Sequence, residues 1–132
     1  YPVLLANAGA EHLVLVTKTR QRLADLDYDF DDLANLMHKH GLVTVLLVWP
    51  ESKKVFHARN TAAGLGIVED PGTGAAAAAF GGYLRELGMI GENAEFTISE
   101  GVDMGRPSEI AVSVIAGEPG VRVTGAAHRI DD

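Results

Sequence analysis

The sequence predicts an α+β domain in which a curled, mostly antiparallel sheet wraps around a central helix. Segments with strand-like alternation or β-branched runs outnumber the helical ones. Most links between them are short and rich in glycine or proline, as in hairpins. The helical segment at residues 74–87 is apolar over nearly three turns, which is typical of a helix surrounded by other elements. An ordinary alanine-rich core helix is the alternative reading.

The first third of the chain is expected to hold two strands and a helix. Residues 3–6 and 12–17 are apolar and β-branched, and a polar turn joins them. Charged residues then lead to a helix over residues 30–40, where apolar side chains recur at helical spacing. Asp29 or Asp31 can cap this helix.

The middle of the chain predicts two strands, a loop and the central helix. Residues 42–49 form a buried-looking strand. In the next strand, residues 55–59, alternation places Phe56 on one face and both His57 and Arg59 on the other. The expected elements after it are a glycine-rich loop over 60–73, the helix over 74–87, and strands over 95–99, 109–115 and 121–125.

Length and composition favour one domain and exclude several classes of site. A chain of 132 residues, 47% of them hydrophobic, is sufficient for a single core. The net charge of −7 argues against a nucleic-acid partner or an anionic membrane. Cysteine is absent, which excludes disulfides and thiol nucleophiles and fits a cytoplasmic protein. No apolar run reaches the ~18 residues of a membrane-spanning helix. Because the chain begins at Tyr1, we expect a fragment or one chain of a cleaved protein.

Asp70 is the candidate catalytic residue. It lies just before the helix that begins near Gly74, and a helix start offers unpaired N–H groups and part of a positive charge. A carboxylate or phosphate bound there would favour the protonated form of the Asp70 carboxyl, as proton donation requires. The alternative is an acid that only shapes the Asp-Pro turn.

The candidate substrate-binding residues lie on both sides of this acid. Thr73, Gly74, Ala75 and Ala76 form the helix start, where glycine leaves room for a ligand and Thr73 can cap the helix instead. From the preceding strand, Arg59 can pair with a carboxylate and His57 can relay protons. Either can equally be a solvated strand residue.

Other site classes find no support in the sequence. No histidines and carboxylates have metal-ligand spacing, so no metal is expected. The glycines form neither a P-loop nor a dinucleotide-binding fingerprint, and no serine lies in a nucleophile motif.

The stretches FHARN…GLGIVEDPGTGAAAAAFGGYL, EGVDMGRPSEIAVSV and VRVTGAA resemble the C-terminal half of the phenazine-biosynthesis (PhzF-like) isomerases. That family has the diaminopimelate-epimerase-like fold. The resemblance implies two similar halves, each a barrel-like sheet around one helix, with the active site between them. It also implies a cofactor-free acid/base enzyme that moves a proton between carbons of a small carboxylated metabolite.

In the resemblance, the family's catalytic aspartate corresponds to Asp70 and its helix-start glycine to Gly74. The serine that often follows is Ala75 here, so one hydroxyl donor is missing. The N-terminal half, with its catalytic base, is absent from these residues, so we expect it to be supplied by the same protein or a second chain. We also expect a homo-oligomer, in the simplest case a dimer. The alternative function is a non-catalytic module of the same fold that binds small acids or serves assembly.

Overall fold

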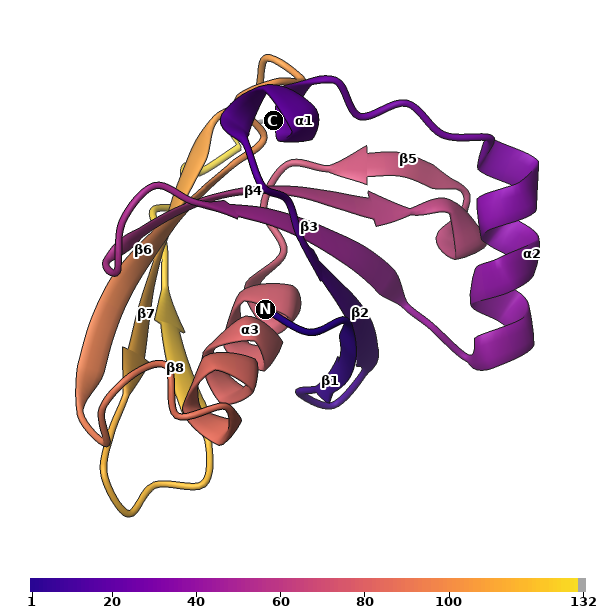
Figure 1. Cartoon of the computed structure of the whole chain (residues 1–132). Helices are drawn as coiled ribbons and strands as arrows, with labels where there is room; N and C mark the ends of the chain where they lie inside the picture. The colour runs from indigo at the N-terminus through magenta and orange to yellow at the C-terminus, as the bar shows by residue number, and fades with distance from the viewer. Residues whose placement is uncertain (131–132) are drawn as a thin grey trace.

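The strands of this protein form one sheet that curls around a helix, as the computed structural model shows for residues 1–130 (Figure 1). The sheet runs in the order β1-β2-β3-β4-β6-β7-β8, and β5 pairs with β4 off this path. β2 lies parallel to β3 and β4 parallel to β6, whereas the other neighbours are antiparallel. The strands are β1 (Leu4–Asn7), β2 (Glu11–Val16), β3 (Thr44–Pro50), β4 (Val55–Ala62), β5 (Ile67–Asp70), β6 (Ala94–Glu100), β7 (Ser108–Val114) and β8 (Val121–Thr124).

Helix α3 (Gly74–Glu86) lies on the concave side of the sheet and packs against β1, β2, β7 and β8 (Figure 1). Most of its side chains are buried, including Phe80 and Leu84. The ring of Phe80 packs edge-on against Phe56 of β4 and Phe96 of β6, with centroids 5.1 and 6.0 Å apart. The prediction of a curled, mostly antiparallel sheet around a central helix is therefore confirmed.

Helix α2 (Phe30–His40) lies on the outer side of the sheet (Figure 1). Asp29 caps it, because its carboxylate accepts the N–H of Asp32 at 2.8 Å. The helix ends at Gly41, whose φ of 65° favours glycine. Met37 anchors α2 in a second, smaller apolar cluster against β3.

Three short elements are not predicted by the sequence. The expected loop over 60–73 is wrong: β4 continues to Ala62, a 3₁₀ turn η1 (Ala63–Leu65) follows, and β5 folds back onto β4. The charged segment 18–29 contains a short helix α1 (Arg20–Ala24), capped by Thr19. All three elements are shorter than six residues, so their local sequence pattern is weak, and contacts with β4 help to hold α1 and β5 in place.

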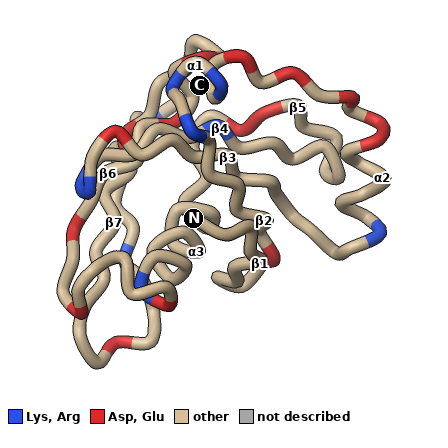
Figure 2. The backbone as a smooth tube through the Cα atoms, in the orientation of Figure 1, with Lys and Arg blue, Asp and Glu red and all other residues tan. Residues whose placement is uncertain are grey.

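Acidic side chains gather on one side of the molecule, along the segment between α1 and α2 and the start of α2 (Figure 2). Within residues 1–130, no helix is both long and apolar enough to cross a membrane.

Candidate active site

Asp70 lies at the end of β5, opposite Asn60 of β4 and four residues before the start of α3. Its carboxylate accepts the Thr73 hydroxyl at 2.7 Å and, more weakly, the Gly72 N–H at 3.4 Å. The second contact is the local turn bond that an Asp-Pro-Gly segment favours. Asp70 therefore shapes the loop and also presents a half-buried carboxyl beside the helix start.

The first turn of α3 leaves backbone donors available. Ala77 is the first residue whose N–H bonds back along the chain, to the Thr73 carbonyl at 3.0 Å. The N–H groups of Gly74, Ala75 and Ala76 precede it and have no partner of that kind. Ala75 is exposed and Gly74 half-buried, whereas Ala76 is buried. An anion can therefore approach the helix start from the side of Gly74 and Ala75.

A cleft adjoins Asp70. Its volume is about 640 Å³, and its lining includes Asp70, Gly72, Arg106 and Ser108. A smaller hollow of about 200 Å³, lined by Gly74 among others, shares Gly72 and Ser108 with it. The acid and the helix start thus border two adjacent hollows with shared walls, and the larger one has room for a small metabolite.

A second carboxylate lies behind the first. Glu100, the last residue of β6, is 1% exposed, and both its oxygens lie 3.3 Å from the Thr73 N–H donor. Burial raises the pKa of Glu100 to about 7, and the negative charge of Asp70 adds to this, while the bond from the Thr73 N–H opposes it. A carboxyl with such a pKa can hold or release a proton near neutral pH.

Thr73 connects the two acids. It occupies the N-cap position of α3, but its hydroxyl makes no capping bond. The hydroxyl donates to Asp70, accepts the side-chain N–H of Asn60 at 2.6 Å, and lies 3.3 Å from Glu100 Oε1. Asn60 is fully buried, and its Oδ1 has no partner among the described residues. The expectation that Thr73 caps the helix through its side chain is therefore wrong.

Close packing fixes the loop that carries Asp70. The Ser108 hydroxyl donates to the Pro71 carbonyl. A Cβ added to Gly72 would lie 2.8 Å from Ser108 Oγ, and one added to Gly101 would lie 2.8 Å from the Pro71 carbonyl oxygen. Gly101 also has a φ of 76°. Only glycine fits at Gly101 without movement of the backbone, whereas a Cβ at Gly72 would displace the Ser108 hydroxyl from its bond to Pro71.

His57 and Arg59 face away from the helix start. The Arg59 guanidinium forms an ion pair with Glu69 at 2.7 Å and donates to the Ala24 carbonyl of α1. His57 contacts Glu51 at 2.5 Å and packs beside Trp49. The structure thus brings Asp70, Thr73, Gly74 and Ala75 together and does not bring these two side chains to them.

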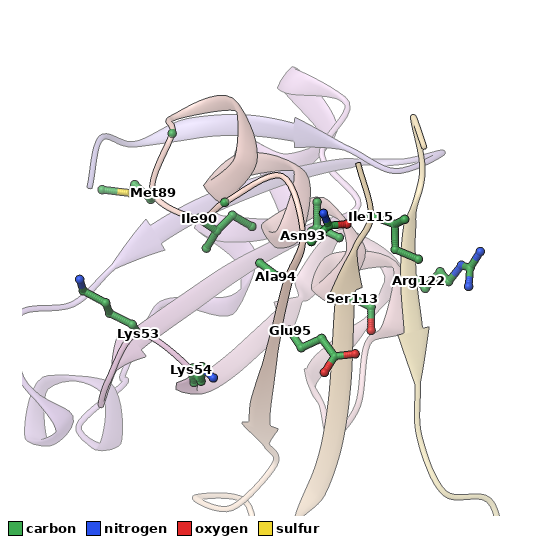
Figure 3. A pocket seen from close by; sticks show the side chains of 13 residues that line it. Lys53, Lys54, Met89, Ile90, Asn93, Ala94, Glu95, Ser113, Ile115 and Arg122 are labelled. Atoms are coloured by element: carbon green, nitrogen blue, oxygen red, sulfur yellow. The ribbon is translucent and has the colours of Figure 1, made fainter. Parts of the chain in front are cut away.

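A larger cavity, about 890 Å³, lies at the other end of α3 (Figure 3). Its walls come from the β3–β4 turn, the segment after α3 and the ends of β6, β7 and β8. Arg122 of β8 is paired with Glu118 at the edge of this cavity, and Glu95 lines it from β6, on the other side of β7. None of the residues of the candidate site borders this cavity.

Comparison with known proteins agrees with the geometry. Residues 1–131 match the sequence profile of the PhzC-PhzF family, described as phenazine biosynthesis-like proteins. The chain belongs to the PhzF family. An uncharacterised isomerase of Deinococcus radiodurans is 33% identical over 116 residues, which is 86% of this chain and 38% of that protein.

Two solved structures share the fold of this PhzF-family chain. A predicted epimerase of Pseudomonas aeruginosa matches with a TM-score of 0.68 and 28% identity, over 92% of this chain and 42% of the other. A PhzF-family phenazine biosynthesis protein of Bacillus anthracis matches with a TM-score of 0.69 and 14% identity, over 92% and 44%. The chain therefore spans less than half the length of the relatives it matches.

Asn60 and Glu100 are not among the site residues that the sequence predicts, although the strand pattern contains a signal for both. In β4 the inward-facing positions are Phe56, Ala58 and then Asn60, and in β6 Glu100 continues the buried face that holds Ile98. A polar residue in register with core positions has to find a partner inside the protein. Such residues are candidates for a site even where no motif marks them.

Proposed function

We propose that this PhzF-family chain is part of an isomerase or epimerase that moves a proton between carbons of a small carboxylated metabolite. The observation that carries the proposal is the pair of adjacent hollows, one lined by Asp70 and the other by Gly74 at the start of α3, where the first N–H groups are free. Asp70 acts as proton donor or carrier, and the helix start binds the substrate carboxylate. The isomerase and epimerase relatives support this reaction class.

The substrate carboxylate is held in this proposal by backbone donors alone. Ala75 has no hydroxyl to add, and Arg59 is engaged by Glu69. The dipole of a helix of 13 residues favours the negative charge. The reaction needs no cofactor, because a carboxyl acid on one side of the substrate and a base on the other complete the proton transfer.

The opposing base is proposed to come from a second, similar half. The relatives are more than twice as long as the matched part of this chain, which supports such a half within the same polypeptide or in a second chain. A homodimer and a cytoplasmic location remain predictions.

The test is exchange of substrate C–H for deuterium, followed by ¹H NMR in D₂O over a panel of small carboxylic acids. The protein is the product of the full reading frame. We expect Asp70→Asn to lower the exchange rate by ~10²–10⁴-fold, the usual range for a general acid, with a much smaller change in substrate affinity. Asp27→Asn, which removes an exposed carboxylate from the segment before α2, is the matched control.

The second candidate function is a non-catalytic module that binds small acids. Ala75 favours it, because a missing donor at the helix start is what loss of catalysis would leave. Binding of a carboxylate at Gly74 without any C–H exchange would establish this alternative. Near-normal exchange by Asp70→Asn would leave Asp70 with only its role in shaping the loop.

A further inference from the structure

The hydroxyl oxygen of Thr73 has three polar neighbours. It lies 2.7 Å from Asp70 Oδ2, 2.6 Å from Asn60 Nδ2 and 3.3 Å from Glu100 Oε1. A hydroxyl has one proton and two lone pairs. Its proton goes to Asp70, the nearer acceptor, so the Asn60 amide must present its NH₂ group, which occupies one lone pair. The other lone pair is left for Glu100.

Only a protonated Glu100 fits that lone pair. An ionised carboxylate has no proton to donate, so two oxygens with lone pairs would face each other inside the protein. The partners of Glu100 on the neighbouring strands, Ala58 and Ser108, are uncharged. The charged groups that act on it are the acids Asp70 and Glu69 of β5, and both disfavour its negative charge.

We propose that Glu100 is a positioning residue that holds a proton for Asp70 and passes it through the Thr73 hydroxyl. The inference rests on the proposed role of Asp70. After Asp70 gives its proton to substrate, the Thr73 Oγ–H proton moves to Asp70 Oδ2. The Glu100 Oε1–H proton moves to Thr73 Oγ in its place. One O–H bond breaks and one forms at each step, and the net result is a protonated Asp70 and an ionised Glu100.

The relay gives Glu100 a function at the buried side of the site. Asp70 is half-buried and borders the cleft, where bound substrate would exclude water, whereas Glu100 is 1% exposed. A proton that arrives from behind does not need to cross the occupied cleft. Burial, which raises the pKa of Glu100 to about 7, keeps this proton available near neutral pH.

The experiment is a ¹³C NMR titration of the side-chain carboxyl carbons in the product of the full reading frame between pH 4 and pH 9. We expect Glu100 to titrate near pH 7 and the Asp70 resonance to show a step at the same pH. Thr73→Ser keeps the hydroxyl and should keep the Asp70 step. Thr73→Val removes the hydroxyl at nearly equal volume and should reduce the step by at least half, while Glu100→Gln should abolish it.

Two results would overturn the relay. The first is a Glu100 carboxyl that is already ionised at pH 5. The second is an Asp70 step that keeps its full size in Thr73→Val, because the two charges would then interact only through space. A measurement without a variant at Thr73 is the exchange of its hydroxyl proton with water. The Thr73 hydroxyl should lose protection against exchange with water as Glu100 ionises. The buried Thr61 hydroxyl, which donates to the Val45 carbonyl, is the reference. A constant ratio between the two hydroxyls also contradicts the relay.

The titration needs no substrate, so its outcome is separate from that of the deuterium-exchange test. Coupled titration in a protein without exchange activity would contradict the proposed function and leave the proton path intact. In an active protein, Glu100→Gln should lower turnover by about tenfold or more and leave KM unchanged, and Glu100→Asp should recover part of the loss. A parallel rise in KM would indicate a purely structural role.

Discussion

Thr73 is the residue on which the candidate site is centred. Its backbone lies at the N-cap of α3, and its side chain joins groups from β4, β5 and β6. A threonine hydroxyl at this position usually bonds to the N–H groups of the first turn. Here the hydroxyl donates to Asp70 and accepts the side-chain N–H of Asn60 in place of a first-turn N–H, so the first-turn N–H groups stay available.

Glu100 should make the stability of the protein depend on pH. Its folded pKa of about 7 lies above the ordinary 4.5, so the folded chain binds more protons than the unfolded chain between those values. The free energy of unfolding therefore falls as pH rises through this window. We expect Glu100→Gln to remove on the order of 1–3 kcal/mol of that pH dependence. Urea unfolding at pH 4.5, 6 and 8 measures it.

The matched control is Glu95→Gln on the same strand. Glu95 is exposed, so its substitution should change the free energy of unfolding by less than about 0.5 kcal/mol at every pH. Equal pH profiles for wild type and Glu100→Gln would show that Glu100 titrates as in the unfolded chain.

At the scale of elements, α3 needs small residues where the sheet closes around it. A Cβ on Gly81 would lie 2.8 Å from Val121 Cγ1 of β8 and 3.1 Å from Val112 Cγ1 of β7. The next residue, Gly82, has no atom within 4 Å of its added Cβ. Two neighbouring glycines of one helix therefore have different roles.

These glycines give a paired test of the enclosed helix. Gly82→Ala should raise the free energy of unfolding by ~0.5–1 kcal/mol, because alanine favours the helix and meets no neighbour. Gly81→Ala should lower it by ~1–3 kcal/mol through overpacking against Val112 and Val121. Thermal or urea unfolding of the two variants measures both changes in the free energy of unfolding. Equal effects of the same sign would contradict the close approach of β8 to α3.

The whole molecule exposes apolar side chains at two places. Val3, Leu4 and Leu5 lie at the β1 edge, and Leu65, Ile67 and Val68 lie on η1 and β5. Exposed apolar patches mark surfaces that other groups cover. A second half of the protein is the cover that the length of the relatives suggests.

This leads to a prediction about the isolated chain. Alone, the 132 residues should show no exchange of substrate C–H protons in D₂O, because one wall of a site lacks the opposing base. They should also self-associate in size-exclusion chromatography. Adding the second half in trans should restore exchange and reduce the association, since halves with separate cores can dock without a peptide link. Exchange by the isolated chain that is lost in Asp70→Asn would show that the site is complete without a second half.

The sequence by itself determined most of the fold and one part of the site. Helical periodicity places α2, an alanine-rich segment apolar on all sides places α3, and alternating or β-branched apolar runs place seven of the strands. The apolar residues on all sides of α3 predict that the sheet surrounds this helix. The Asp-Pro-Gly-Thr-Gly segment places Asp70 before a helix start. These properties are local, so they can be predicted from adjacent residues.

Only the tertiary structure decided which side chains surround Asp70. Glu100 is 30 residues away along the chain and reaches Thr73 because β6 pairs with β4 in parallel. Arg59 is not part of the site, because it forms an ion pair with Glu69. Glu69 lies on β5, which folds back onto β4. Such contacts depend on strand order and register, which local patterns do not specify, and a buried charge takes the nearest partner that the fold supplies.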